Sequence, residues 1–129
     1  MKLQVAIDRV SLAHAITLAK DLDGIADVIE LGTSLVKDYG LIALSDIKAE
    51  IKQSELLMDL KAIDEGVYEF NKGFEVNADI LTVMGSADLS TISAVYDVTE
   101  KAGKTMLIDL LNICLLYTSP SPRDRTRSR

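Results

Sequence analysis

Hydrophobic and polar positions along the chain follow two alternating patterns. Five short runs are rich in β-branched and aliphatic residues, and the segments between them carry apolar residues at helical spacing. The runs cover residues 3–8, 27–32, 56–61, 79–85 and 105–110. The pattern therefore predicts four βα units followed by a fifth strand.

Capping residues and apolar stripes define the four predicted helices. The first helix begins after Ser11, a good N-cap, and the fourth lies between Asp88 as N-cap and Gly103 as C-terminal stop. In the second helix a single stripe places Ile42 toward the core and Lys48 toward solvent. The predicted helices cover about residues 12–22, 34–51, 65–76 and 88–103.

Strict alternation of strands and helices predicts an α/β fold with a parallel sheet, either open and doubly wound or part of a TIM (βα)8 barrel. No glycine occurs in residues 8–11 after the first strand, so a dinucleotide-binding or Walker-type phosphate loop loses its main support. Both architectures bind ligands at the C-terminal ends of their strands. Charged residues near these ends are Asp8, Glu30, Asp59, Lys61 and Asp109. Acids at successive strand ends favour the barrel.

Composition limits the class of protein. The chain is 48% hydrophobic with a net charge of −6, which suits a folded domain and disfavours nucleic acid and anionic lipid as partners. Its apolar runs have the length of strands and are too short to span a membrane. The apolar stretch at its start is too short, and ends in too acidic a residue, for the apolar part of a signal peptide. We therefore expect a cytoplasmic protein with no membrane or nucleic-acid partner. A single cysteine, Cys114, excludes a disulfide within one chain.

The end of the chain differs from the rest in composition. Residues 114–129 carry four arginines, one acid and both prolines. Back-translation of residues 114–124 gives a string that resembles a transposase sequencing adapter. We therefore expect residues 114–129 to be a non-native, disordered tail, and residues 1–113 to be an incomplete (βα)8 barrel domain whose native sequence continues.

The third predicted strand ends in a charged motif. Because side chains alternate along a strand, Asp59 and Lys61 are expected to point together into the barrel. Burial of a lone ammonium is costly, so acids such as Asp8 and Glu30 are expected beside this lysine. Spacing alone leaves an alternative, in which the strand ends in ordinary solvated charges. The first interpretation describes a preorganised array of charges.

The chain resembles the orotidine 5′-monophosphate decarboxylase superfamily of ribulose-phosphate-binding barrels over residues 1 to about 113. The resemblance is carried by agreement in all five predicted strands, by Asp8, by Glu30-Leu31-Gly32-Thr33 and by the motif Asp59-x-Lys61-x-x-Asp64. Within the superfamily it is strongest to aldol synthases of formaldehyde assimilation, which condense formaldehyde with D-ribulose 5-phosphate. One alternative is a decarboxylase of 3-keto-L-gulonate 6-phosphate, or another carboxy-lyase of the superfamily. Another is a truncated fragment that catalyses nothing.

This resemblance also implies roles for individual residues. Glu30 and Asp59 would hold Mg²⁺, which stabilises the enediolate formed when the sugar loses a proton from C1. Lys61 would place a positive charge at the developing oxyanion. Asp8 would bind substrate hydroxyls, and Asp64 would reach the active site of the partner subunit in a homodimer. Asp59, Lys61 and Asp64 are thus the predicted catalytic residues. The family's general base and phosphate-binding loops follow the fifth strand.

Overall fold

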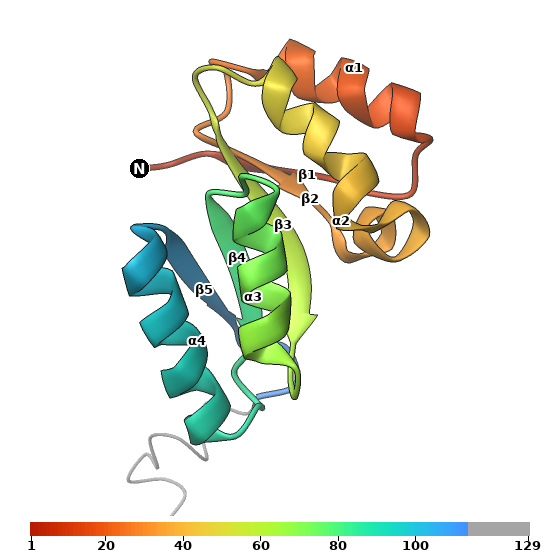
Figure 1. Ribbon diagram of the computed structural model, residues 1–129. Coiled ribbons are helices and arrows are strands. Elements are labelled where there is room, and N and C mark those ends of the chain that lie inside the picture. Colours follow the sequence, from red (N-terminus) through yellow and green to blue (C-terminus); the bar gives the residue numbers. More distant parts are fainter. Residues whose placement is uncertain (114–129) are drawn as a thin grey trace, which may run out of the picture.

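A computed structural model describes residues 1–113 as an alternating series of strands and helices (Figure 1). In chain order the elements are β1 (Gln4–Ile7), α1 (Leu12–Leu22), β2 (Val28–Leu31), α2 (Thr33–Glu50), β3 (Glu55–Ala62), α3 (Gly66–Glu75), β4 (Ile80–Met84), α4 (Leu89–Ala102) and β5 (Thr105–Asp109). The four predicted βα units and the fifth strand are confirmed. The predictions for residues 114–129 lie outside the described residues.

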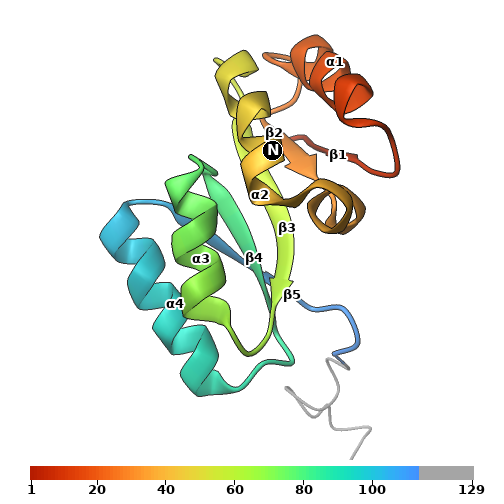
Figure 2. The same cartoon turned by 45° about the vertical axis from the view of Figure 1, so that its right-hand side comes forward.

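The strands form one parallel sheet in the order β1-β2-β3-β4-β5. Each strand pairs with the one that follows it, so every right-handed crossover turns in the same direction and places its helix on the same side of the sheet. Figures 1 and 2 show the four helices outside a curved sheet. A doubly wound sheet would reverse direction after its first strands. The described residues are therefore part of a TIM barrel.

The core has two layers because side chains alternate along the strands. A small inner cluster on the helix-free side consists of Val28, Leu57 and Ile80. The main cluster fills the space between sheet and helices. Its largest fully buried side chains include Ile29, Leu31, Leu35, Leu44, Ile47, Leu56, Met58, Phe70, Leu81, Val83 and Val95. Burial of both faces explains why β4 reads as a continuous apolar run with one threonine.

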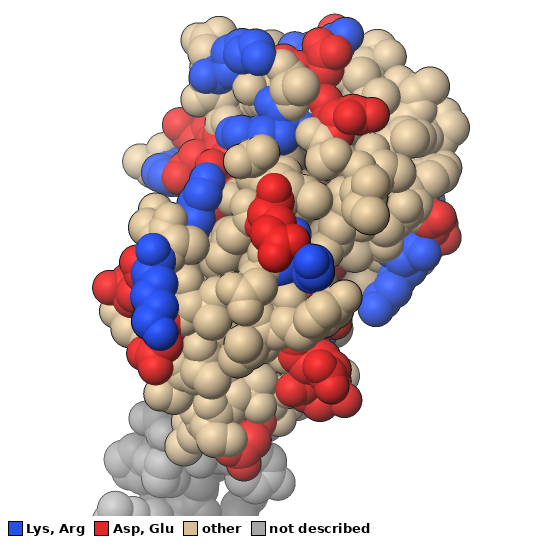
Figure 3. Space-filling model, viewed as in Figure 1, with Lys and Arg blue, Asp and Glu red and all other residues tan. Residues whose placement is uncertain are grey.

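The predicted helix ends are largely confirmed. The Ser11 hydroxyl accepts the N–H of His14 at 3.3 Å, and the Asp88 carboxylate accepts the N–H of Ser90 at 2.8 Å. Gly103 ends α4 with a φ of 62°, in the left-handed region that favours glycine. None of the helices within residues 1–113 is long and apolar enough to cross a membrane. On the helix-covered face, acidic and basic side chains are interspersed (Figure 3).

The apolar stripe assigned to α2 is partly wrong. Ile42, predicted to face the core, is 85% exposed, while the side chain of Lys48, predicted to face solvent, is half-buried against Asp79. The reason is a kink at Gly40, whose φ of 73° and ψ of 164° interrupt the helix. Residues on either side of this kink follow different helical phases. A single stripe drawn through the whole segment therefore misplaces Ile42 and Lys48, which both follow the kink.

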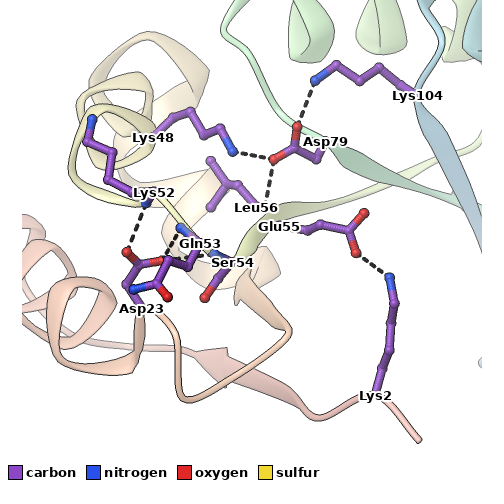
Figure 4. A network of polar contacts seen from close by, with 10 residues as sticks. All are labelled: Lys2, Asp23, Lys48, Lys52, Gln53, Ser54, Glu55, Leu56, Asp79 and Lys104. Atoms are coloured by element: carbon purple, nitrogen blue, oxygen red, sulfur yellow. Dashed lines mark hydrogen bonds and ion pairs between the residues drawn. The ribbon is translucent and has the colours of Figure 1, made fainter.

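A polar network joins the N-terminal ends of the strands, opposite the edge where ligands bind in barrels (Figure 4). Asp79 precedes β4, and its carboxylate accepts the N–H of Leu56 at 3.0 Å and pairs with Lys104 at 2.7 Å and with Lys48. Burial alone raises the pKa of Asp79, but these donors outweigh it and hold the pKa below its usual value. Asp79 therefore ties α2, β3, β4 and the start of β5 together.

We expect Asp79→Asn to lower the free energy of unfolding of the complete protein by about 2 kcal/mol at pH 7, the usual worth of hydrogen bonds to a charged group. A carboxyl with a depressed folded pKa stabilises above its unfolded pKa, and this contribution is lost as the pH falls through the folded value. The difference from wild type should therefore shrink below about pH 4. Urea titrations at both pH values measure it, with exposed Asp97→Asn as control. Equal losses in the two variants at pH 7 would contradict the role of Asp79.

Candidate active site

The charged residues predicted to mark the functional edge do lie there. Glu30 is within β2, Asp59 and Lys61 are within β3, and Asp109 ends β5. Asp8 follows the last residue of β1. Because all five strands are parallel, their C-terminal ends meet at one edge of the sheet.

Asp59 is the most deeply buried acid of this edge, with a side chain only 8% exposed. Its Oδ1 accepts the hydroxyl of Thr82 at 2.7 Å, and its Oδ2 accepts the hydroxyl of Thr33 at 2.5 Å. The same Oδ2 lies 3.1 Å from Nζ of Lys61. Burial alone raises the pKa of Asp59, but these hydrogen bonds and the ammonium outweigh it and keep the pKa below its usual value. Asp59 is therefore an ionised carboxylate held by a hydroxyl from the start of α2 and by another from β4.

Lys61 lies between two carboxylates. Its Nζ is 3.1 Å from Oδ2 of Asp59 and donates a hydrogen bond to Oδ2 of Asp109, whose Oδ1 accepts the N–H of Leu111 at 2.8 Å. Burial alone lowers the pKa of Lys61, but the two aspartates outweigh it and raise the pKa above its usual value. The lysine is thus a fixed positive charge. Its side chain is 31% exposed, so the charge remains accessible from the edge of the sheet.

The backbone between these two residues is irregular. Met58 pairs with Leu81, but the next pair is Ala62 with Val83, so β3 contains two residues more than β4 over this stretch. This stretch, residues 59–61, forms a β-bulge, and Lys61 within it has a φ of 52°, unusual for a residue with a Cβ. The side chains of Asp59 and Lys61, at the two ends of this bulge, contact each other.

The other two acids have different partners from those predicted. Oδ1 of Asp8 accepts the hydroxyl of Ser34 at 2.6 Å, and Oε2 of Glu30 accepts Nε2 of Gln4 at 2.6 Å. The prediction that they flank Lys61 is wrong, because its side chain extends across β4 toward the aspartate of β5, away from β1 and β2. Within residues 1–113, the ammonium thus pairs with the acids of β3 and β5.

Gly32 provides space for Asp8. Its φ of −64° is open to any residue, so the backbone alone does not require glycine. A Cβ added at this position would lie 2.2 Å from Oδ1 of Asp8, closer than any real contact. The glycine at the end of β2 therefore allows the carboxylate that follows β1 to lie against it.

Asp64 lies apart from this cluster within the described chain. It is exposed beyond the end of β3, and its Oδ1 accepts the N–H of Glu65 at 3.0 Å. It borders an open hollow of about 270 Å³ between the starts of α3 and α4. The hollow is lined by Asp64, Glu65, Val67, Tyr68, Ser90, Thr91 and Ala94. Its predicted action in a partner subunit stays a prediction.

The carboxylates of Glu30 and Asp59 suit a magnesium ion. Glu30 is level with Leu57, and Asp59 follows two residues later on the same strand, so both side chains point to the inner face. Within residues 1–113 no three acidic, histidine or cysteine side chains are grouped tightly enough to hold a metal by themselves. Mg²⁺ commonly uses one or two carboxylates and completes its shell with water and substrate oxygens. The donor set therefore fits this ion.

Two residues of the cluster were not anticipated from the sequence. Thr33 and Thr82 supply the hydroxyls that hold Asp59. Thr33 belongs to a stretch that carries the resemblance, but a threonine after a strand also resembles an ordinary helix-start residue, and no contact with Asp59 was predicted for it. Thr82 is the one hydroxyl in the apolar run of β4, and its inward position could have been derived from strand alternation.

The fold and this edge place the protein in the class of (βα)8 barrels that bind ligands at the C-terminal ends of their strands. The family model described as "Orotidine 5'-phosphate decarboxylase / HUMPS family" matches residues 1–116. The chain belongs to this family, which confirms the resemblance inferred from its motifs.

Two curated relatives of similar sequence are 3-hexulose-6-phosphate synthases. The chain is 41% identical over 113 residues to the 3-hexulose-6-phosphate synthase of Bacillus subtilis, spanning 88% of this chain and 54% of that protein. It is 37% identical over 110 residues to the synthase of Methylomonas aminofaciens, spanning 85% and 53%. The chain thus spans about half the length of these curated relatives.

Solved structures agree with these sequence matches. A crystal structure of 3-hexulose-6-phosphate synthase superposes with a TM-score of 0.81 at 39% identity, over 85% of this chain and 53% of that one. The 3-keto-L-gulonate-6-phosphate decarboxylase of Vibrio cholerae gives a TM-score of 0.78 at 31% identity, over 83% and 50%. Synthases and a decarboxylase thus share this half of the barrel.

Proposed function

We propose that the complete protein, to which residues 1–113 contribute five strands of the barrel, condenses formaldehyde with D-ribulose 5-phosphate to give 3-hexulose 6-phosphate. The observation that supports this most is the array of Asp59, Lys61 and Asp109 at the C-terminal edge of the sheet. The sequence identity to proteins named for this synthase activity supports this choice of reaction.

In this proposal Glu30 and Asp59 hold Mg²⁺. When bound, the ion supplies a Lewis acid for the oxygens of the sugar. The chain's own contribution is to present two carboxylates on one face of adjacent strands. Thr33 and Thr82 occupy one side of the Asp59 carboxylate and fix its plane. Because Lys61 also approaches Oδ2, the lone pair left for the ion is the second one of Oδ1.

Lys61 supplies a positive charge of fixed position. Its ammonium is already oriented by Asp59 and Asp109, so it need not reorganise when negative charge develops on a sugar oxygen. Asp8, anchored by Ser34, accepts hydrogen bonds from substrate hydroxyls in this proposal. Asp64 lies away from the cluster, and we propose that it acts across a homodimer interface.

The second candidate is decarboxylation of 3-keto-L-gulonate 6-phosphate. The structural similarity to the Vibrio cholerae decarboxylase supports it, since the two TM-scores differ by only 0.03 (0.81 against 0.78). The charge array alone does not separate the two reactions, because both develop negative charge on an oxygen beside the reacting carbon. The higher identity to the synthases favours condensation.

We expect the complete protein to consume formaldehyde in the presence of ribulose 5-phosphate and Mg²⁺, with kcat/KM at least about tenfold above that for decarboxylation of 3-keto-L-gulonate 6-phosphate. The two rates are measured on one preparation, by formaldehyde loss and by carbon dioxide release. A chelator should abolish the first activity, and added Mg²⁺ should restore it. The opposite ratio would identify the protein as the decarboxylase. Absence of both activities would rule out both candidate functions.

A further inference from the structure

Thr82 connects the two charged residues of β3 through one hydroxyl group. The residue lies on β4 and is only 3% exposed. Its Oγ1 donates a hydrogen bond to Oδ1 of Asp59 at 2.7 Å and accepts the N–H of Lys61 at 2.9 Å. One hydroxyl therefore contacts the side chain of the first residue of the bulge and the backbone of the last.

The bulge makes this double contact possible. In a regular parallel pair, continuing from Met58 and Leu81, Thr82 would be level with Asp59 and Lys61 would be level with Met84. The two extra residues instead shift Lys61 by two positions relative to β4, which is about 7 Å, or twice the rise per strand residue. Both ends of the bulge then lie opposite Thr82. Without the bulge, the backbone N–H of Lys61 would face a different part of β4.

The conformation of Lys61 needs such a partner. Its φ of 52° falls in the left-handed region, which is disfavoured for residues with a Cβ. Backbone in this region persists where surrounding contacts determine it. Three contacts meet at Lys61: the Thr82 hydroxyl on its N–H and the two aspartates on its ammonium. Of these, the hydroxyl alone acts on the backbone.

We propose that Thr82 is a positioning residue, whose hydroxyl locks the bulge of β3 and thereby sets where Lys61 and Asp59 present their charges to the substrate. The inference deepens the proposed function and rests on it for the reacting groups. A misplacement of a reacting group by about 1 Å can cost about a hundredfold in rate. The lock therefore matters to turnover and not only to stability.

Thr82→Val tests the lock because valine keeps the volume and shape of threonine and removes only the hydroxyl. Thr33 still holds the other oxygen of Asp59, so the carboxylate retains one hydroxyl partner. Thr82→Ser restores the hydroxyl without the methyl group. The matched control is Thr99→Val, which removes a buried hydroxyl that donates to the Val95 carbonyl within α4 at 2.7 Å.

In the complete protein we expect Thr82→Val to lower kcat for formaldehyde condensation by about a hundredfold with a smaller change in KM. Thr82→Ser and Thr99→Val should keep kcat near wild type. A purely structural role predicts instead that the two valine variants lose thermal stability alike and keep the same kcat. A Thr82→Val enzyme that turns over as fast as the Thr99→Val enzyme would overturn the proposal.

Amide hydrogen exchange at Lys61, followed by NMR on the same variants, gives a readout independent of the reaction. The N–H should be protected in wild type, Thr82→Ser and Thr99→Val, and should lose protection in Thr82→Val. Unchanged protection in Thr82→Val would show that the hydroxyl does not hold the bulge. If wild type lacks synthase activity, the proposed function fails, while this exchange result still decides whether Thr82 locks the strand.

Discussion

Asp59→Asn is expected to lower kcat/KM for ribulose 5-phosphate and formaldehyde by about a thousandfold or more in the complete protein. The substitution removes the negative charge that faces Lys61 and, in the proposed site, one of the two carboxylates that hold Mg²⁺. The amide keeps one acceptor oxygen but places an NH2 donor where either Thr82 or Thr33 now donates, so one of these two hydrogen bonds must be lost or reversed. The defect combines lost metal affinity with a disturbed lysine.

Steady-state kinetics over a range of Mg²⁺ concentrations measure this loss. Because the ligand charge is gone, excess Mg²⁺ should recover little activity. Asp97→Asn, an exposed change on α4, is the control and should behave as wild type. If Asp59→Asn kept near wild-type activity, and a chelator still abolished that activity, the enzyme would need a metal that Asp59 does not bind.

Asp109→Asn separates the two functions of the array. This variant removes one partner of Lys61 but leaves the carboxylates of Glu30 and Asp59 intact. Comparison of Asp59→Asn with Asp109→Asn therefore distinguishes loss of a metal ligand from loss of a neighbour of the ammonium. Only Asp59→Asn should change how activity depends on the Mg²⁺ concentration.

The alternation of the chain was sufficient to predict the order and type of every described element. Parallel strands buried on both faces and helices with caps such as Ser11 and Asp88 are properties of short segments, so the sequence records them directly. The choice of a barrel over a doubly wound sheet needed more than alternation: it came from the charges at the strand ends and from the family resemblance. The kink at Gly40 was not predicted, because a glycine inside a helical pattern does not reveal whether its φ is positive.

The site was predicted in outline but not in its pairings. Strand alternation correctly placed Asp59 and Lys61 on one face, because that depends only on their separation. The partner of the lysine depends on the bulge of β3 and on the direction of a long side chain, and neither has a local sequence signal. Asp109 was therefore noticed as an acid at a strand end without being recognised as the residue that Lys61 contacts.

The last prediction concerns residues 1–113 expressed alone, which we expect to be inactive and to associate or aggregate. Within the described residues β1 and β5 each pair with one neighbouring strand, so each presents an unpaired edge. Apolar side chains at and after β5 are also exposed. They include Leu107 at 36%, Ile108 at 43%, Leu110 at 52% and Leu111 at 56%. Such edges and apolar groups favour pairing between chains.

Turnover should be below detection even if the four βα units remain folded. The resemblance places the general base and the phosphate-binding loops after the fifth strand, outside this piece. Loss of a general base commonly costs about 10² to 10⁴-fold, and loss of phosphate contacts removes the remote binding energy that positions the sugar. Formaldehyde consumption and light scattering on residues 1–113 measure both expectations, with the complete protein as control. Monomeric protein whose turnover rate lies within about tenfold of the rate of the complete protein would show that the base lies among the described residues.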